Sequence, residues 1–414
     1  MPCIAVVGTF DTKGLEHAFV ADLIRARGHS TLLIDVGTLD APTVPHDISR
    51  EVVARAGGVD LLQIASRRDR GEAVAAMGLG AAAILTELQA AGRISGVISL
   101  GGGGGTSIAT TGMQCLPLGF PKVMVSTLAS GNVAPYVGVK DIVMIPSIVD
   151  VSGINRISRV TLSRAAGAIC GMVEQPVPSS NDKPVIVASM FGNTTQCVQH
   201  ARGLLEKEGY EVLVFHATGT GGRTMESLVE TGLVSGVLDI TTTEWADELV
   251  GGILGAGPKR CEAAARQGVP AIVTPGCLDM VNFQEPGSVP DTFRGRRFYQ
   301  HNPKVTLMRT TPEECAELGR ILAEKINRST GPITVLFPTK ALSVISAPGQ
   351  PFHDPVADLA LLTAWKSHLR PDIPFLVLDC EINDPVFAEA CVHALLGNIK
   401  IGAVPVSERC LLTS

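Results

Sequence analysis

Five consecutive glycines, at positions 101–105, are the feature of this sequence that most constrains its fold. A strand-like apolar run at 96–100 precedes them, and Thr106, Ser107 and a helix-compatible run from Ile108 follow. Because glycine loses more backbone entropy on folding than any other residue, five in a row need a reason. Without Cβ atoms, a ligand can approach the main chain and successive N–H groups can converge on an anion. A helix beginning near Thr106 would add its free N–H groups and positive dipole end, so the stretch predicts a phosphate site.

The glycine stretch matches neither of the two common nucleotide fingerprints. No Gly-Lys-Ser/Thr follows, and Thr106 stands where Gly-x-Gly-x-x-Gly needs its last glycine. The acidic residue expected about 20 positions on for ribose recognition is missing, because residues 121–125 form the next predicted strand. These departures count against a dinucleotide-dependent oxidoreductase. A flexible loop or tight turn is the alternative to a phosphate site, and the position between strand and helix favours the phosphate site.

The composition excludes several classes of partner. The 414 residues suffice for two or three domains, and the formal net charge of −6 comes without blocks of like charge. This balance, with an aromatic content of 4%, argues against nucleic acid or an anionic membrane as the main partner. We find no apolar run of bilayer length and no basic leader after Met1. Ten cysteines without C-x-x-C pairs indicate reduced thiols rather than disulfides or zinc, so we expect a cytoplasmic protein.

Strand-like runs rich in Val and Ile alternate with helix-like segments along the whole chain. This pattern predicts an α/β fold of two Rossmann-like, doubly wound domains with mainly parallel sheets and an interdomain cleft. The proline-rich, polar stretch at 174–183 is typical of a linker, which gives an N-terminal domain at 1–178 and a C-terminal domain at 179–414. The halves also look like a degenerate repeat, with chance similarity as the alternative. Its matched segments are 96–99 with 236–239 and 121–126 with 270–274.

Ligands of open α/β sheets bind beyond the carboxyl ends of the strands, so the residues after each predicted strand are the candidate site. In the N-terminal domain they are rich in glycine and hydroxyl groups, which suit phosphate oxygens and sugar hydroxyls. Lys13 would add a point charge to a phosphate, and Asp11 would hold Mg²⁺ through water. The alternative is that Thr9 and Asp11 only cap a helix beginning near Leu15. The predicted cofactor-binding residues are Gly8, Thr9, Asp11, Lys13, Gly101, Gly102, Gly103, Gly104, Gly105, Thr106, Ser107, Ser126, Thr127, Ser130, Gly131 and Asn132, with Asp35, Ser147 and Asp150 at neighbouring strand ends.

The strand ends of the C-terminal domain carry more varied chemistry. Residues 218–222, before a predicted helix, are a candidate second anion site, whereas 241–244 resemble a helix N-cap. His216 is a candidate acid or base near neutral pH, although a lone histidine at a strand end is more often structural. No Ser-His-Asp order, paired-histidine metal spacing or nucleophile elbow is present, so a binding cleft is better supported than a catalytic mechanism. The candidate catalytic residues are His216, Asp239 and Glu244, and the candidate second-ligand residues are His216, Thr218, Gly219, Gly221, Gly222, Thr241, Thr242 and Thr243.

Seven segments spread over the chain carry a family resemblance: GTFDTK at 8–13, GGGGGTS at 101–107, VSTLASG at 125–131, FHATGTGGR at 215–223, VLDITTTE at 237–244, LDMVNF at 278–283 and VTLMRTT at 305–311. Together they resemble the ATP-binding family named after a plant tobamovirus-resistance protein. The resemblance implies two Rossmann-like subdomains, ATP bound chiefly by the N-terminal one, and a homodimer. The plant member has a further TIM-barrel domain resembling a phosphoenolpyruvate hydrolase, so a separate TIM-barrel protein is a candidate partner. Ala341 and Glu381 depart from the family, where glycine and, in the plant relative, histidine are usual.

The leading hypothesis is a cytoplasmic ATP-binding protein with a small metabolite in the interdomain cleft, facing 216–222 and 241–244. Coupling ATP to that metabolite would make the protein a small-molecule kinase or a ligase-like enzyme. The second hypothesis is a non-catalytic nucleotide sensor or scaffold that docks a partner such as the TIM-barrel protein. The third is the dinucleotide-dependent oxidoreductase.

Overall fold

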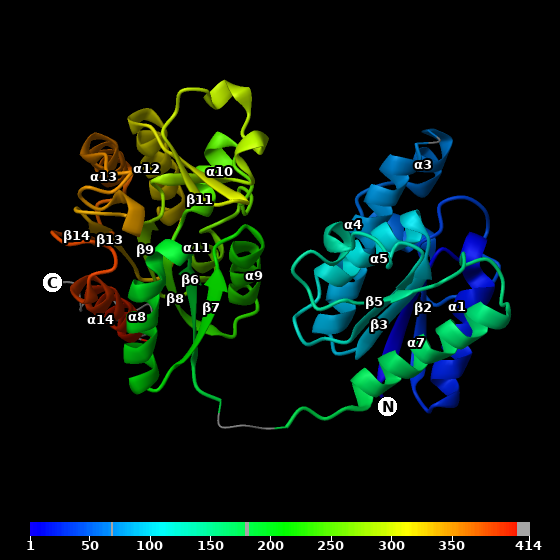
Figure 1. Ribbon diagram of the computed structural model, residues 1–414. Coiled ribbons are helices and arrows are strands. Elements are labelled where there is room, and N and C mark those ends of the chain that lie inside the picture. The colour runs from blue at the N-terminus through cyan, green and yellow to red at the C-terminus, as the bar shows by residue number, and fades with distance from the viewer. Residues whose placement is uncertain (68, 179–181, 404–414) are drawn as a thin grey trace. The chain divides into compact units, whose positions relative to one another are not determined.

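A computed structural model describes residues 1–67, 69–178 and 182–403. The chain divides into two compact units, Met1–Ser179 and Ser180–Ser414, which we call unit 1 and unit 2 (Figure 1). Each is an α/β unit with its own parallel sheet and its own apolar core, as the alternation of strands and helices predicts.

Unit 1 is built on a five-stranded parallel sheet with the order β2-β1-β3-β4-β5. Its elements are β1 (Cys3–Gly8), α1 (Phe10–Ala26), β2 (Ser30–Asp35), α2 (Arg50–Ala56), α3 (Leu61–Arg67), α4 (Arg70–Ala90), β3 (Gly96–Gly101), α5 (Gly103–Gln114), β4 (Lys122–Ser126), α6 (Ala134–Val137), β5 (Val143–Pro146) and α7 (Arg156–Glu174). Alternate residues of β1 face opposite sides of the sheet. Ile4 and Val6 pack with α1 and α7, whereas Ala5 and Val7 pack with α2, α4 and α5.

Unit 2 has a six-stranded parallel sheet with the order β14-β13-β9-β8-β6-β7 and a small antiparallel sheet with the order β10-β12-β11. Its strands are β6 (Val185–Met190), β7 (Glu211–His216), β8 (Val234–Thr241), β9 (Ala271–Gly276), β10 (Met280–Phe283), β11 (Phe298–Asn302), β12 (Val305–Arg309), β13 (Ile333–Pro338) and β14 (Phe375–Leu378). Its helices are α8 (Thr195–Lys207), α9 (Thr220–Val229), α10 (Glu244–Val250), α11 (Ala263–Gln267), α12 (Pro312–Ile326), α13 (Pro355–His368) and α14 (Pro385–Gly402), with 3-10 turns at Gly192–Thr194, Pro286–Ser288, Asp291–Phe293 and Val344–Ser346. The α8 and α14 helices cover one face of the large sheet, and α9, α10, α12 and α13 contribute to the core on the other.

The two parallel sheets share a connectivity, in keeping with the predicted repeat. The first five strands of the large sheet of unit 2, in chain order, are β6, β7, β8, β9 and β13. They lie in the sheet as β7-β6-β8-β9-β13, which matches the order β2-β1-β3-β4-β5 of unit 1. The matched segments 96–99 and 236–239 lie in β3 and β8, which are third in both orders. In unit 1 the chain adds β2 on one side of β1 and then returns to add β3 on the other side. The crevice at the carboxyl ends of the two strands where this reversal occurs, here β1 and β3, is the usual ligand site.

The helices that follow β1 and β3 begin earlier than the sequence predicts. The α1 helix has an additional first turn from Phe10, where Asp35 Oδ1 accepts the Phe10 N–H at 3.1 Å and so caps the helix from the next strand. The backbone is non-helical at Lys13 (φ −133°, ψ 26°), so the continuous part of α1 starts close to the predicted Leu15. The α5 helix begins at Gly103 rather than near Thr106, with the Thr106 N–H donating to the Gly102 carbonyl at 2.9 Å. Three of the five glycines therefore form the first turn of a helix and not a loop.

The small antiparallel sheet was missed in part. The sequence predicts β12 but assigns 276–282 to a loop and leaves 298–302 unassigned, whereas the structure has β10 and β11 there. The β11 strand is largely exposed, with a polar stretch at its centre, so it lacks the apolar alternation on which the prediction depends.

The α4 helix corrects the expectation that no segment reaches bilayer length. Its 21 residues have a mean hydropathy of 1.5 in the most apolar window, enough to cross a membrane by length and composition alone. Side chains such as Met77 and Leu85 are buried in the unit 1 core together with α2 and α5. Because 44% of that window is buried inside the structure, and core helices can have the same length and composition, this one helix is weak evidence for a membrane span.

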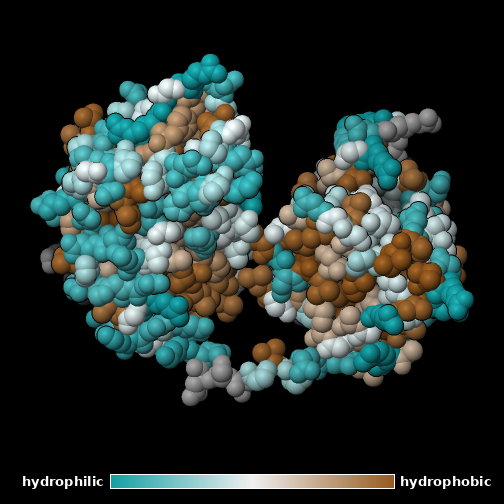
Figure 2. Space-filling model, viewed as in Figure 1, coloured by the Kyte–Doolittle hydropathy of each residue, from teal (hydrophilic) through white to brown (hydrophobic). Residues whose placement is uncertain are grey.

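Charge is divided unequally between the units. Unit 1 contains equal numbers of basic and acidic residues, 14 of each, so the net charge of −6 belongs to unit 2. On the faces shown in Figure 2, apolar side chains (brown) cover much of unit 1, whereas unit 2 is mostly hydrophilic (teal). Binding of a charged ligand by unit 1 must therefore depend on local groups and not on a long-range field.

The close contact between α2 and α4 depends on Gly80. A Cβ atom at this position would lie 2.0 Å from the Val53 carbonyl oxygen, which cannot move without moving α2. We expect Gly80→Ala to lower the free energy of unfolding by about 1–3 kcal/mol through overpacking. Gly171→Ala is the matched control in α7, because nothing lies within 4 Å of its added Cβ. It should instead stabilise by about 0.5–1 kcal/mol, and urea unfolding of both variants would contradict this packing if the two shifts had the same sign.

Candidate functional site

The N-terminus of α5 is made of glycines and is not capped by a side chain. Gly102 is the N-cap residue in an extended conformation, and no side-chain hydrogen bond caps the helix. Thr106, in the first turns of α5, and Ser126, the last residue of β4, are joined by a hydroxyl–hydroxyl hydrogen bond of 2.7 Å. This bond connects the start of α5, which follows β3, to the carboxyl end of the neighbouring strand β4. The free N–H groups and positive dipole end of a 12-residue helix are thus held in place at the edge of the sheet.

A pocket of about 890 Å³ lies at this edge, within unit 1. Seven of the predicted cofactor-binding residues line it: Thr9, Asp11, Lys13, Gly102, Gly103, Gly104 and Gly105. They come from the carboxyl ends of β1 and β3, the crevice that the strand order singles out. Thr12 and Ile108, close in sequence to these residues, also line the pocket. The other lining residues come from more distant parts of the sequence: Thr38, Leu39, Asp40, Ile64, Asp69, Arg70, Ala73, Val74 and Asp150.

The remaining predicted residues lie elsewhere. Ser126, Thr127 and Ser130 line a second pocket of about 380 Å³, whose wall includes Ser147 and Asp150. Asp150 is shared by both pockets. Buried Gly8, Gly101 and Thr106, half-buried Ser107 and exposed Gly131 and Asn132 line neither pocket.

Gly8 has an internal role. A Cβ atom there would lie 2.1 Å from His17 Nε2, so the glycine gives room to this fully buried ring. Burial lowers the pKa of His17 to about 4, and its Nδ1 lies 2.7 Å from the Lys13 carbonyl oxygen. His17 is therefore neutral at physiological pH and supports the first turns of α1.

Asp11 and Lys13 are both engaged by the protein itself. Asp11 Oδ2 accepts the Leu39 N–H at 2.9 Å, while its Oδ1 is buried and has no hydrogen-bond partner. Lys13 Nζ donates to the Val151 carbonyl oxygen. The ammonium group expected to contact a phosphate is thus fixed to the backbone. Neither residue caps α1 with its side chain, since Asp35 fulfils that function.

The pocket contains more negative than positive groups. Asp11, Asp40, Asp69 and Asp150 line it, against the two cations Lys13 and Arg70. Carboxylate oxygens suit Mg²⁺, which usually binds through one or two carboxylates together with substrate phosphates. The exposed carboxylates Asp40 and Asp150 therefore fit a magnesium ion better than the buried Oδ1 of Asp11.

In unit 2, the predicted second anion site holds a carboxylate of the protein. Glu244 Oε1 accepts the N–H groups of Gly219 and Gly222 at 2.7 and 3.0 Å. A Cβ atom at Gly222 would lie 2.1 Å from Glu244 Oε2, so only glycine fits there. Amides at the N-terminus of α9 do bind an anion, as the glycine pattern at 218–222 predicts, but this anion is internal.

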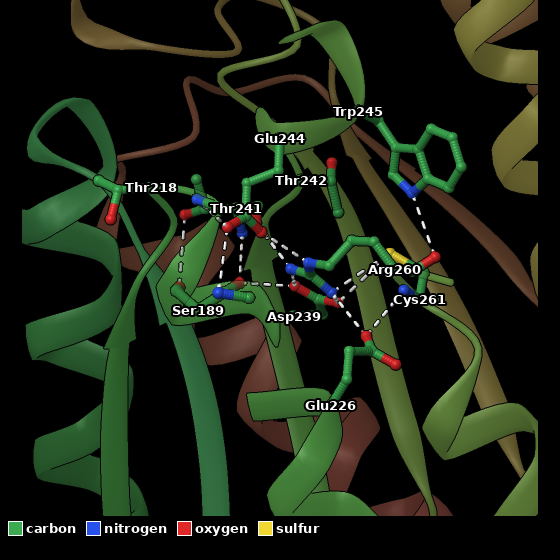
Figure 3. A network of polar contacts seen from close by, with 12 residues as sticks. Ser189, Thr218, Glu226, Asp239, Thr241, Thr242, Glu244, Trp245, Arg260 and Cys261 are labelled. Carbon is green, nitrogen blue, oxygen red and sulfur yellow. Dashed lines mark hydrogen bonds and ion pairs between the residues drawn. The ribbon is translucent and has the colours of Figure 1, made fainter. Parts of the chain in front are cut away.

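Arg260 is the centre of the same network (Figure 3). Its guanidinium makes two 2.6 Å bonds to the Asp239 carboxylate and a 2.7 Å bond to Glu244 Oε2. A weaker contact of 3.1 Å joins it to Glu226, which also accepts three N–H groups at the start of α11. The Arg260 side chain is 1% exposed, so these are buried ion pairs with several hydrogen bonds each.

Electrostatics in this network favour the charged arginine. Burial opposes the charge, yet Asp239 and the other neighbouring groups hold the pKa of Arg260 well above its usual range. Burial raises the pKa of Glu226 and also raises that of the Cys261 thiol well above its usual range. Ligand atoms of Glu226, Asp239 and Cys261 lie within 4.8 Å of one another, as a metal site would require. The position between the carboxylates is already taken by Arg260, so these residues do not fit a metal ion.

Most of the other predicted unit 2 residues are also engaged internally. Thr241 Oγ1 lies 2.8 Å from Thr194 Oγ1, and Thr242 Oγ1 donates to the Thr274 carbonyl at 2.9 Å. Thr243 is the N-cap residue of α10, as the sequence suggests, but makes no side-chain cap. His216 is exposed at the end of β7, with its ring 5.4 Å from that of Phe191, while Thr218 and Gly221 are half-buried.

Two arginines of these sites were not predicted. Arg70 is separated from the glycine stretch by about 30 positions, and Arg260 lies in an irregular segment without any motif. No local pattern distinguishes either from a surface arginine. A search for basic residues before predicted helices would have selected Arg70, whereas only the tertiary structure selects Arg260.

Two doubly wound α/β units, the first with an open, glycine-lined helix N-terminus, define a two-domain Rossmann-like protein. The chain belongs to the uncharacterised protein family UPF0261. It matches the N-terminal domain of that family over residues 2–178 and the C-terminal domain over residues 183–399.

Three relatives align with nearly the whole chain. A UPF0261 protein of Clostridium tetani is 48% identical over 399 residues, covering 96% of this chain and 99% of the relative. One from Rhizobium meliloti is 50% identical over 396 residues, covering 95% and 98%. The ToMV resistance protein Tm-1(GCR237) of Solanum lycopersicum is 37% identical over 428 residues, covering 95% of this chain but 55% of the tomato protein. The predicted resemblance to the plant resistance protein is confirmed at the level of the family.

Solved structures offer only distant likeness. UDP-N-acetylglucosamine 2-epimerase from Rickettsia bellii is 12% identical with a TM-score of 0.22, covering 66% of this chain and 78% of the epimerase. MurG from Acinetobacter baumannii is 10% identical with a TM-score of 0.21, covering 96% and 100%. Scores this low carry no argument about function.

The buried network makes Arg260 critical for the stability of unit 2. In Arg260→Met, Asp239 and Glu244 lose their cation, and we expect a loss of about 3–5 kcal/mol at neutral pH. Urea unfolding of the variant and of wild type at neutral pH measures this loss. Arg202→Met, which removes an exposed pair with Glu206, is the control and should cost about 0.5 kcal/mol or less.

Proposed function

We propose that unit 1 binds ATP, with its phosphates at the glycines of residues 102–105. The observation that carries this proposal is the uncapped N-terminus of α5 at the wall of a pocket of about 890 Å³. Free amides and the helix dipole favour an anion there, and the absence of Cβ atoms lets it come close. The choice of ATP among nucleoside phosphates comes from the family resemblance at the same residues.

Mg²⁺ is part of the proposed complex. The four carboxylates that line the pocket would repel a free polyphosphate, and a divalent cation between them removes this repulsion. Asp40 and Asp150 are the residues that would hold the ion, which would neutralise phosphate charge.

The second, smaller pocket supports a place for the nucleoside. Its hydroxyl groups, from residues such as Ser130, suit the hydroxyls of a ribose. Because Asp150 belongs to both pockets, one extended ligand can occupy the two together.

A non-catalytic nucleotide sensor or scaffold is the second candidate function, and the Arg260 network favours it over a kinase or ligase-like enzyme. Of the candidate catalytic residues, Asp239 and Glu244 are buried and paired with Arg260, which leaves only His216 exposed. A homodimer, a cytoplasmic location and a separate TIM-barrel partner belong to this proposal, since all three were expected from the sequence.

Gly103→Val tests the phosphate assignment. A Cβ atom added at Gly103 would meet only Leu128, at 4.0 Å, and Gly103 lines the pocket, so we expect the variant to fold. We expect calorimetry to show an affinity for MgATP at least about tenfold lower, equivalent to about 1.4 kcal/mol. Gly203→Val, in an α8 position with nothing within 4 Å, controls for the added valine and should bind like wild type. Equal affinity of Gly103→Val and wild type would remove the phosphates from this turn.

Magnesium dependence tests the charge argument. ATP affinity of the wild type should fall at least about tenfold when MgCl₂ is replaced by EDTA, because the ligand then meets the carboxylates directly. In Asp150→Asn one of these charges is absent, so the ratio of the two affinities should shrink. An unchanged ratio in the variant, with intact ATP binding, would show that Asp150 does not face the phosphates or their cation.

A further inference from the structure

Arg70 lies over the first turn of α5. Its Nη2 atom is 3.4 Å from the position that a Cβ atom of Gly104 would occupy, and Arg70 also lines the pocket. The residue is exposed and opens α4, so its guanidinium reaches the glycine turn across from another helix. The sequence separates these two helix starts by more than 30 positions, and the fold brings them together.

The guanidinium of Arg70 has no acceptor in the described part of the chain. Neither an ion pair nor a side-chain hydrogen bond joins Arg70 to any residue within 1–67, 69–178 or 182–403. Its neighbour Asp69 is occupied, because Asp69 Oδ1 accepts the Glu72 N–H at 3.0 Å and caps α4. Lys13, the other cation of the pocket, is bound to the Val151 carbonyl. Arg70 is thus the cation of this pocket whose hydrogen-bonding groups are free for a ligand.

Unit 2 contains the same combination of helix-start amides and a guanidinium around an anion. There, two amides beside the N-terminus of α9 and the guanidinium of Arg260 together hold the carboxylate of Glu244. Both donor types converge on one anion. In unit 1 the amides belong to α5 and the guanidinium to Arg70, and the place of the anion is the open pocket.

We infer that Arg70 is the phosphate-binding cation of unit 1 and donates to the polyphosphate held at residues 102–105. This inference rests on the proposed nucleotide site and names a binding residue within it. A planar guanidinium offers two parallel N–H donors to phosphate oxygens, which a lysine at the same position cannot reproduce. In this inference, Arg70 on α4, and not the predicted Lys13 on α1, supplies the positive charge that binds the phosphate.

Titration calorimetry with three probes tests the inference: Mg-tripolyphosphate, MgATP and adenosine, each against wild type, Arg70→Ala and Arg70→Lys. Because Arg70→Ala loses charged hydrogen-bond donors, it should bind both polyphosphates about 10- to 100-fold more weakly. Arg70→Lys should recover part of this loss. Adenosine affinity should not change, because the nucleoside has no phosphate. Arg67→Ala, which removes a nearby exposed arginine paired with Glu72 and outside the pocket, is the control and should match wild type.

The possible failures are distinguishable. If Arg70→Ala binds both polyphosphates as tightly as wild type, the assignment of Arg70 is overturned and the nucleotide site stands. If Arg70→Ala loses adenosine affinity to the same extent, Arg70 acts on the pocket as a whole, which also overturns the assignment. If wild type binds neither tripolyphosphate nor ATP, the proposed function itself fails.

Discussion

Backbone N–H groups at the start of a helix need acceptors, and the candidate site depends on how α5 meets this need. At three other helices of unit 1 a side chain supplies an acceptor: Asp69 caps α4, Asn155 caps α7, and Asp35 reaches across from β2 to cap α1. The short helices α2 and α6, like α5, have no side-chain cap. The α5 helix starts on glycines that have no side chain to offer. An unsatisfied helix start at the crevice of a doubly wound sheet is a place where a ligand can complete the hydrogen bonding.

The two units share a strand order but differ in what the free amides at a helix start contact. In unit 2, Glu244 fills the amides before α9, and Arg260 balances the charge within the core. The result is a rigid, closed polar network that contributes to folding. In unit 1 the amides at the start of α5, which follows a different strand of the shared order, lie at a pocket whose lining includes four carboxylates. With the function proposed above, the repeated architecture would use one half for stability and the other for binding.

The sequence predicts the features that depend on local pattern. Val- and Ile-rich runs gave the α/β class, and the glycines at 101–105 gave the helix start at the crevice, although that helix begins three residues earlier than expected. Long-range partners could not be predicted in this way. Asp239 and Glu244 were candidate catalytic residues because they are polar residues near a strand end, and only the arrival of Arg260 from a later segment shows that they are buried ion pairs. Asp35 capping α1 from β2 is a similar case, because the capping residue and the helix are 25 positions apart.

The contact between Gly222 and Glu244 has a consequence for how the sequence of unit 2 can vary. The carboxylate occupies the space where any side chain at position 222 would begin. A larger residue at 222 is tolerated only if position 244 becomes shorter, and that change in turn removes the acceptor of two amides and one of the acceptors of Arg260. The three positions form one coupled set, so single replacements at any of them should be rare among functional sequences and compensated ones should come in groups.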